Sequence, residues 1–219
     1  MPRHLIVNAD DLGASRGLNR GILEAHERGI VTSASLMVAR PAAEEAVALA
    51  ARAPALSVGL HFEAPAELDG ADPEAVRAEL DAQLRRFDEL VGGPPTHLDS
   101  HHHVHRSDGL AAVFASAAAE LGLPLRATPP VVFIGGFYAQ WEWQVTELHY
   151  VSVEFLEQIL RTEVTAEWTE LGCHPGYIDD DYRSVYLHER EEELRTLTNP
   201  RIREVLDELG IELRSYRDL

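Results

Sequence analysis

The sequence is poor in cysteine and in basic side chains. Its 219 residues include a single cysteine, Cys173, and only 19 lysines and arginines against 37 aspartates and glutamates. One cysteine forms neither an intrachain disulfide nor a cysteine-based zinc site. The formal net charge of −18 repels phosphate backbones and anionic membrane surfaces. We therefore expect no nucleic acid and no membrane as a partner.

Long apolar runs and nucleotide-binding glycine motifs are also missing. No apolar segment approaches the ~20 residues that a membrane span requires, and the N-terminus enters a strand-like segment without a signal-peptide pattern. We expect a cytoplasmic protein. No Gly-x-Gly-x-x-Gly or phosphate-loop pattern follows the first strand. The sequence therefore lacks the signature of the open sheets that bind nucleotides.

The pattern of the remaining residues predicts one α/β domain spanning residues 1–219. A composition of 45% hydrophobic and 26% charged residues is that of an ordinary globular protein. Apolar, β-branched segments predict strands at 5–7, 30–38, 56–62, 96–100, 124–128, 168–173 and 211–213. Helical spacing predicts helices at 15–28, 42–53, 73–91, 110–121, 152–164, 189–197 and 200–209. Residues 129–150 are expected to be a loop or lid with room for a short strand.

This alternation of strands and helices is typical of a parallel sheet. We expect a distorted (β/α) TIM-like barrel rather than an open doubly wound sheet. In both folds, ligands bind at the carboxyl ends of the strands.

Histidines are concentrated in one stretch, residues 96–105 (THLDSHHHVH). It holds five of the chain's eleven histidines and one carboxylate. Imidazole is the commonest protein metal ligand and is easily tuned for proton transfer near neutral pH. A solvated polar loop rich in histidine is the plain alternative.

Polar residues follow the predicted strands at four separate ends: Asp10 with Asp11, His61, the stretch from Asp99 to His105, and His174. Two imidazoles and one carboxylate make a three-ligand metal site with open positions, which suits metal-assisted hydrolysis. A second carboxylate can act as a general base, and a further histidine can protonate the leaving group.

Each of these residues also has a structural interpretation. Asp10 and Asp11 can end a strand and begin a turn, His61 can be a satisfied histidine at the edge of the core, and His174 can be a turn residue before Pro175. Cys173 is interpreted as a small buried hydrophobe. Trp141 and Trp143 are as compatible with the core as with a loop over a sugar pocket.

Five motifs occur in order along the chain: NADDLG at 8–13, GIVTS at 29–33, GLH at 59–61, the stretch at 96–105, and HPGY at 174–177. This ordered set resembles the YdjC-like carbohydrate deacetylases, and among them the chitooligosaccharide deacetylases. The resemblance implies a distorted barrel, one divalent metal ion, and hydrolysis of the N-acetyl group of an N-acetylglucosamine unit with release of acetate. It also suggests a homodimer. The segments after Glu63 and Thr128 look shortened, which leaves the identity of the sugar open.

Carried over by position, the resemblance makes Asp11, His61 and His101 metal ligands and Asp10 the base that deprotonates a water. His174 is the candidate acid. Candidate substrate contacts are Asp99, His103, His105, Arg106 and Tyr177. A site with two histidines and one carboxylate suits zinc, cobalt, nickel, manganese or iron, whereas the family is commonly described as magnesium-dependent.

Two other functions stay open at this point. One is a different metallohydrolase, such as a phosphoesterase, which would favour a second metal and a basic pocket. The other is a non-catalytic barrel that binds a sugar or a metal.

Overall fold

The fold is a curled parallel sheet wrapped by helices, seen here in a computed structural model that describes residues 2–66, 72–180 and 182–219. The strands lie in the order β4-β3-β2-β1-β6-β5. β7 pairs with the first half of β1, and β2 pairs with the second half of β1 along the same edge. Their bounds are Arg3–Leu12 (β1), Ser33–Leu36 (β2), Ser57–Phe62 (β3), Leu98–Ser100 (β4), Val131–Ile134 (β5), Trp168–Cys173 (β6) and Ile211–Arg214 (β7).

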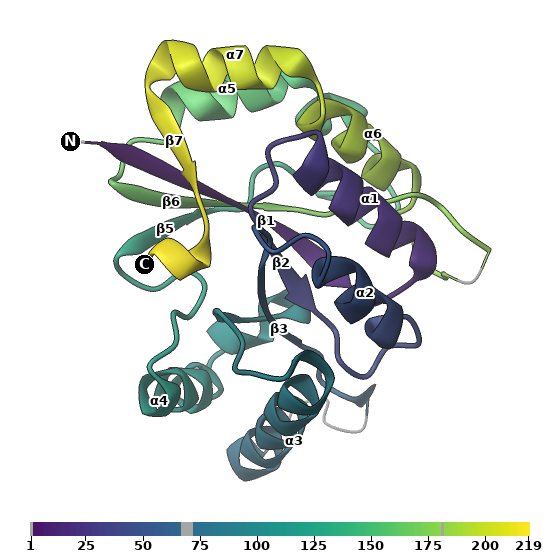
Figure 1. The fold of residues 1–219 in the computed structure, drawn as a ribbon, viewed down its shortest axis with the longest axis vertical. Coiled ribbons are helices and arrows are strands. Elements are labelled where there is room, and N and C mark those ends of the chain that lie inside the picture. Colours follow the sequence, from purple (N-terminus) through teal and green to yellow (C-terminus); the bar gives the residue numbers. More distant parts are fainter. Residues whose placement is uncertain (1, 67–71, 181) are drawn as a thin grey trace.

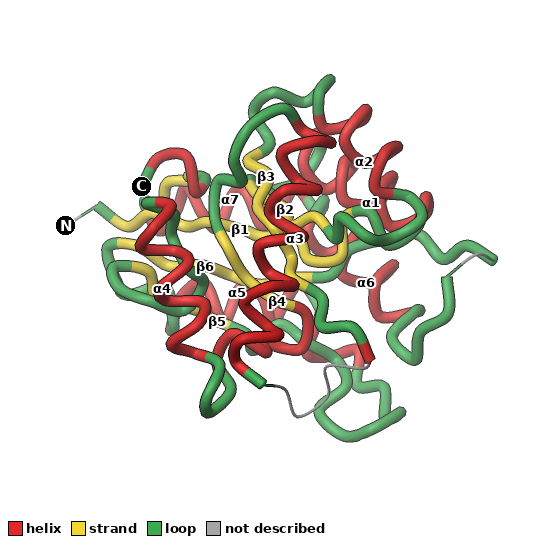
Figure 2. The backbone as a smooth tube through the Cα atoms, turned by 90° about the horizontal axis from the view of Figure 1, so that it is seen from below, coloured by secondary structure: helices red, strands yellow, loops and turns green. Residues whose placement is uncertain are grey.

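The helices cover the outside of this sheet (Figure 1), with α5 beside α7 at one end and α3 near α4 at the other. Figure 2 shows the strands inside the ring of helices from a second direction. The bounds are Arg16–Glu27 (α1), Ala43–Ala50 (α2), Pro73–Val91 (α3), Ala111–Leu121 (α4), Val153–Thr162 (α5), His188–Leu197 (α6) and Pro200–Leu209 (α7).

The predicted distorted barrel is confirmed, and its closure is incomplete. Residues 124–126 extend the sheet beyond β4: the Leu98 N–H donates to the Pro124 carbonyl, and the Arg126 N–H donates to the Leu98 carbonyl. Leu98 and Leu125 form an isolated parallel bridge there. The sheet therefore curls far enough to bring the carboxyl ends of distant strands around one centre.

The strand predicted at 124–128 is wrong. Beyond the bridge at Leu125, the chain turns away at Ala127, whose φ is 60°, and Pro129 and Pro130 have no N–H to donate to a ladder. The strand that pairs with β6 is β5, which lies in the segment 129–150, expected to be a loop or lid with room for a short strand. Two adjacent β-branched residues, Val131 and Val132, suit a strand at that position.

Most helix boundaries agree with those predicted, because they depend on local capping. The Ser15 side chain accepts a hydrogen bond from the Leu18 N–H, and the Ser152 side chain accepts one from the Phe155 N–H. Gly92 and Gly122 adopt the left-handed conformation that ends α3 and α4. No helix of the described residues is long and apolar enough to cross a membrane.

The centre of the core is β1. Leu5, Ile6 and Val7 are fully buried, because parallel strands covered on both sides are apolar throughout. Further along, the same strand carries Asp10 and Asp11, which are also buried. The apolar half of β1 thus anchors two carboxylates at the carboxyl edge of the sheet.

Candidate metal centre and active site

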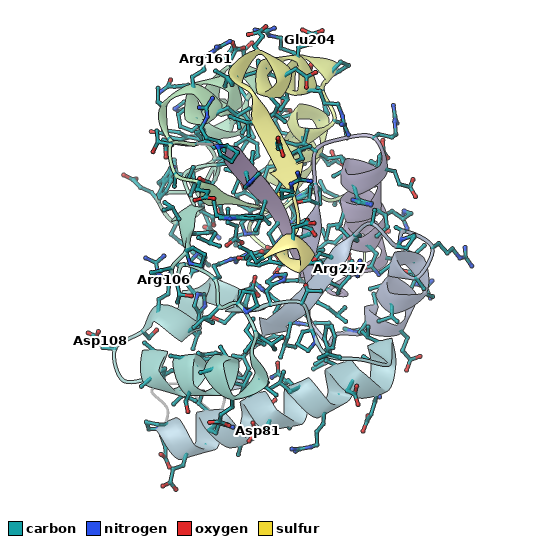
Figure 3. All side chains as sticks on the ribbon, turned by 60° about the vertical axis from the view of Figure 1, so that its left-hand side comes forward. Asp81, Arg106, Asp108, Arg161, Glu204 and Arg217 are labelled. Carbon is teal, nitrogen blue, oxygen red and sulfur yellow. The ribbon has the colours of Figure 1, made fainter. Side chains whose placement is uncertain are left out.

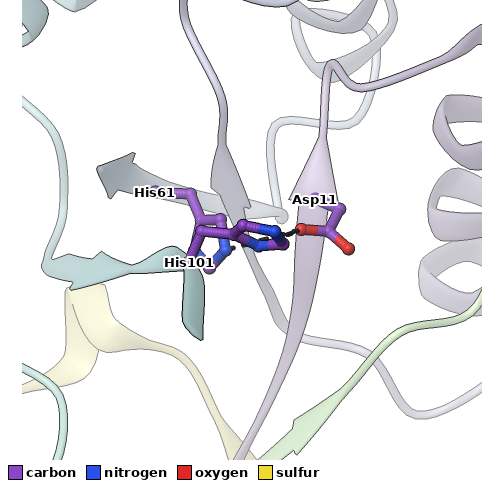
Figure 4. Close-up of side chains that lie close together, drawn as sticks. All are labelled: Asp11, His61 and His101. Carbon is purple, nitrogen blue, oxygen red and sulfur yellow. Dashed lines mark ion pairs between the residues drawn. The ribbon is translucent and has the colours of Figure 1, made fainter. Parts of the chain in front are cut away.

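Three side chains from separate strand ends meet at one point. Asp11 is at the end of β1, His61 is in β3, and His101 follows β4 directly. One ligand atom from each lies within 4.8 Å of the others. Asp11 Oδ1 is 3.5 Å from His61 Nε2 and 3.2 Å from His101 Nδ1 (Figure 4). These are the three residues that the resemblance suggests as metal ligands.

A local irregularity of β1 brings both aspartates to this site. The register of β1 against β2 shifts between Ala9 and Leu12, as in a β-bulge. Asp11 has a φ of 67°, a left-handed value that costs less for aspartate than for most other residues. In a regular strand, adjacent side chains point to opposite faces. Here both Asp10 and Asp11 lie near the His61 ring.

Asp11 has one satisfied oxygen and one unsatisfied oxygen. Oδ2 accepts a hydrogen bond of 2.6 Å from Arg190, whereas the buried Oδ1 accepts none. Burial opposes ionisation of Asp11, but Arg190 and the nearby histidines lower its pKa well below the usual range. An ionised, buried oxygen facing two imidazole nitrogens is an arrangement that a cation satisfies.

The electrostatics of His61 favour a cation in the same place. Burial disfavours the protonated ring, but Asp99 and Asp10 outweigh burial and raise the pKa of His61 to about 10. The carboxylates around His61 therefore attract positive charge to its ring. The donor set of two imidazoles and one carboxylate fits a divalent transition-metal ion.

Asp99 lies behind His61. Its Oδ1 is 2.7 Å from His61 Nδ1, a contact that leaves Nε2 facing Asp11. Its Oδ2 accepts from the Ser35 hydroxyl at 2.5 Å and contacts Arg126 at 2.8 Å. Asp99 is fully buried. A carboxylate in this position orients a metal-binding histidine and fixes its tautomer.

Asp10 is held in place by hydrogen bonds from two residues, Arg126 and Asn8. Arg126 forms a two-pronged pair with it, with bonds of 2.7 Å to Oδ2 and 2.6 Å to Oδ1, and the Asn8 amide donates to Oδ1 at 2.9 Å. Burial opposes ionisation, but Arg126 and His61 lower the pKa of Asp10. Asp10 is thus an ionised carboxylate whose Oδ2 retains one free lone pair.

Arg126 is itself fully buried among three carboxylates. Besides Asp10 and Asp99, its Nε donates to Glu170 at 2.8 Å, and the Tyr216 hydroxyl donates to the other Glu170 oxygen at 2.5 Å. Burial raises the pKa of Glu170 to about 7, although Arg126 opposes this. The network thus extends from Tyr216 in the C-terminal segment to Asp10 of β1.

His174 also lies beside Asp10. Its Nε2 is 3.9 Å from Asp10 Oδ2, and its Nδ1 is 3.7 Å from Glu193 Oε1. Glu193 is fully buried and accepts from the Tyr186 hydroxyl and from the His174 backbone N–H. Burial disfavours the charged His174 ring, but Glu193 outweighs it and raises the pKa. Glu193 therefore favours the protonated form of the His174 ring.

The remaining predicted residues lie farther from the cluster. His103 is partly buried with its ring 5.3 Å from Phe133, and burial lowers its pKa to about 4. His105 is 2% exposed and hydrogen-bonds Ser100. Arg106 lies at the outer surface (Figure 3).

Tyr177 donates its hydroxyl to Glu24 of α1, away from the metal cluster. Cys173 is buried, and burial raises its pKa well above the ordinary value. This agrees with its interpretation as a small hydrophobe.

Sequence reasoning did not assign a role to the residues that surround the ligands: Asn8, Ser35, Arg126, Glu170, Arg190 and Glu193. Arg126 and Arg190 are far from Asp10 and Asp11 in sequence and meet them only in the fold. The sequence did contain one signal of a buried ion pair: Glu170 is a charged residue in the middle of a largely apolar strand. Buried charges of this kind require a partner.

Comparison with known proteins identifies the family. The model of the family described as YdjC-like protein matches residues 4–67 and 62–208. This chain belongs to the YdjC-like family. The two matched ranges of this YdjC-like protein overlap at residues 62–67. This is where the segment after Glu63 looks shortened relative to the family.

Two relatives align with the whole of this chain. A carbohydrate deacetylase from Geobacillus stearothermophilus is 38% identical over 251 residues, with 98% of its length covered. A chitooligosaccharide deacetylase from Serratia marcescens is 34% identical over 261 residues, with 100% covered. Both alignments contain more positions than this chain has residues, so the relatives carry insertions relative to it.

Solved structures share the fold. A crystal structure of an Enterococcus faecalis V583 protein, assigned to cellobiose-phosphate cleavage, has a TM-score of 0.84 and 28% identity, covering 100% of this chain and 99% of that one. A family 4 carbohydrate esterase from Streptomyces lividans, in complex with acetate, has a TM-score of 0.63 at 15% identity, covering 96% and 91%. The second likeness concerns the fold alone.

Proposed function

We propose that this YdjC-like protein is a metal-dependent carbohydrate deacetylase, which hydrolyses the N-acetyl group of a sugar containing N-acetylglucosamine and releases acetate. The proposal is carried by the unpaired Asp11 Oδ1 facing two imidazoles, with Asp10 and His174 alongside. The relatives named carbohydrate deacetylase and chitooligosaccharide deacetylase support it.

Asp11, His61 and His101 are the proposed ligands. When bound, a divalent cation supplies Lewis acidity, which makes water more acidic and an amide carbonyl more electrophilic. Asp99 orients the His61 ring so that Nε2 faces the centre, and Arg190 holds Asp11 through its other oxygen. Both contacts reduce the freedom of the ligands before a cation arrives.

Asp10 is the proposed base. Its free Oδ2 lone pair accepts the proton of the attacking water, while Arg126 and Asn8 keep the carboxylate from turning. The attack makes the carbonyl carbon tetrahedral and places negative charge on its oxygen.

His174 is the proposed acid, which gives a proton from Nε2 to the nitrogen of the departing amine. Its raised pKa favours the protonated ring, whereas the lowered pKa of His103, about 4, keeps that ring neutral near pH 7. The contrast favours His174 over His103 as the acid. For Asp99 we propose an orienting role, because it contacts His61 Nδ1, in place of the substrate contact expected from the sequence.

The decisive experiment measures acetate released from N,N′-diacetylchitobiose. The protein is assayed as purified, after chelation, and after addition of zinc, magnesium, manganese, cobalt, nickel or iron one at a time. We expect release to stop on chelation and to return with one ion, which identifies the metal. Unchanged release after complete chelation contradicts the metal dependence.

The same assay separates the two other functions. Phosphate released from a phosphorylated disaccharide, with no acetate from N-acetylated sugars, indicates the phosphoesterase. The Enterococcus faecalis relative is named for cellobiose-phosphate, which supports including a phosphorylated disaccharide in this assay. Sugar binding without turnover under every ion indicates the non-catalytic barrel.

A further inference from the structure

Two tryptophans stand exposed beside the candidate active site. Trp141 is 56% exposed and Trp143 is 78% exposed, so the core interpretation is wrong for both. They belong to the segment 135–150, which begins where β5 ends. The segment therefore leaves the sheet at the edge that also carries Asp11, His61 and His174.

Trp141 is connected to the site by a row of aromatic rings. The centroid of His174 is 5.7 Å from that of Tyr138, Tyr138 is 6.0 Å from Trp141 at 89°, and Trp141 is 6.2 Å from Tyr150 at 77°. Tyr138 stacks in parallel on Tyr186 at 4.7 Å. Edge-to-face contacts with Tyr138 and Tyr150 fix the orientation of the Trp141 ring.

Trp143 differs from Trp141 in this respect. In the part of the chain that the structure describes, its ring makes no aromatic contact, and it is the more exposed of the two. The loop thus offers one anchored indole and one free indole, two residues apart. Only the anchored indole continues the row from His174.

The charges of the loop indicate a neutral occupant. Residues 135–150 include Glu142 and Glu147 and no lysine or arginine. Such a surface attracts neither phosphate nor carboxylate groups. A pyranose ring is neutral, and its C–H face packs on an aromatic ring while its hydroxyls stay in water. An exposed, fixed indole next to a polar site suits such a ring.

We propose that Trp141, supported by Tyr138, is a stacking platform for the sugar ring next to the one that is deacetylated. This rests on the proposed function, because it takes His174 and the metal cluster as the place where the acetamide binds. The bound chain runs outward along the row of rings.

The kinetic test compares Trp141→Ala with the matched control Trp143→Ala. Acetate release is measured on N-acetylglucosamine, N,N′-diacetylchitobiose and tetra-N-acetylchitotetraose. We expect the wild-type KM to fall with chain length, and Trp141→Ala to raise KM for the tetramer on the order of tenfold with little change in kcat, as loss of uniform binding does. Activity on the monosaccharide should be unchanged, and Trp143→Ala should behave as wild type.

Several outcomes overturn the platform while leaving the deacetylase in place. They are a wild-type KM independent of chain length, equal effects of the two tryptophan variants, and an equal loss on the monosaccharide. A dimer on size exclusion that Trp141→Ala converts to a monomer overturns it as well, since the indole then belongs to an interface between two copies.

A binding test separates this proposal from the proposed function. Tetra-N-acetylchitotetraose is titrated into the Asp10→Asn protein while tryptophan fluorescence is followed, with Trp141→Phe or Trp143→Phe added to that background. We expect the sugar-dependent change to disappear only with Trp141→Phe. If no sugar releases acetate and this change is still seen, the platform stands and the deacetylase fails. No change in any variant overturns the platform.

Discussion

Replacement of Glu193 by glutamine should shift the basic limb of the pH–rate profile to lower pH. Glu193 faces His174 at 3.7 Å and is the main group that raises the pKa of this ring. His174 must be protonated to act as the acid, so activity is present below its pKa and is lost as pH rises through it. Without the Glu193 charge, the pKa of His174 falls, and that loss begins earlier.

The structure sets the size of the shift. Two unit charges 4 Å apart interact by about 1 kcal/mol in water and about 4 kcal/mol at an effective dielectric constant of 20. The side chain of His174 is 26% exposed, so solvent weakens the pair, and we expect an effect near the lower end of this range.

The assay is kcat/KM for acetate release between pH 5 and 10 with the metal supplied at saturation. The matched control is Glu192→Gln, which removes the same charge from the next residue of α6. Glu192 is more exposed and pairs with Arg195. A Glu193→Gln profile with its basic limb in place, or a control that shifts equally, refutes the assignment of His174 as the acid.

Four further changes test the rest of the site. Asp10→Asn should retain the metal but lower kcat by about 10²- to 10⁴-fold, the usual contribution of a general base, measured as acetate release with metal analysis. His61→Ala should lose the metal together with the rise in Tm that added metal gives the wild type. Asp99→Asn should weaken metal affinity by about 10- to 100-fold through a misoriented His61, measured by competition with a chelator. Arg126→Met leaves buried carboxylates unpaired, which costs about 3–5 kcal/mol and lowers Tm by about 6 °C or more in a chain of this size; an unchanged Tm contradicts the structural role of the pair.

The sequence predicted the fold well wherever local signals decide it. Serine caps, terminal glycines and apolar spacing determine where α1, α3, α4 and α5 begin or end. The strand at 124–128 was wrong because its pairing depends on the closure of the barrel, where Leu125 makes one bridge before Ala127 turns the chain. A β-branched pair in the next segment became the strand instead.

The meeting of Asp11, His61 and His101 could be anticipated because polar residues at the carboxyl ends of parallel strands converge. The bulge at Asp10 and Asp11 could not, because it is a matter of register between β1 and β2. Arg126 and Arg190 were likewise beyond reach. Each meets its aspartate across more than a hundred residues of sequence, and no periodicity encodes such a pairing.

These two arginines give the adjacent aspartates different environments. Arg126 grips both oxygens of Asp10, and Asn8 adds a third donor, so Asp10 has little capacity left for a cation. Arg190 holds only Oδ2 of Asp11 and leaves Oδ1 facing two imidazoles. The number of guanidinium contacts therefore separates the proposed base from the proposed ligand. A second arginine contact to Asp11 would abolish the cation site, and the loss of Arg126 would leave two aspartates competing for one ion.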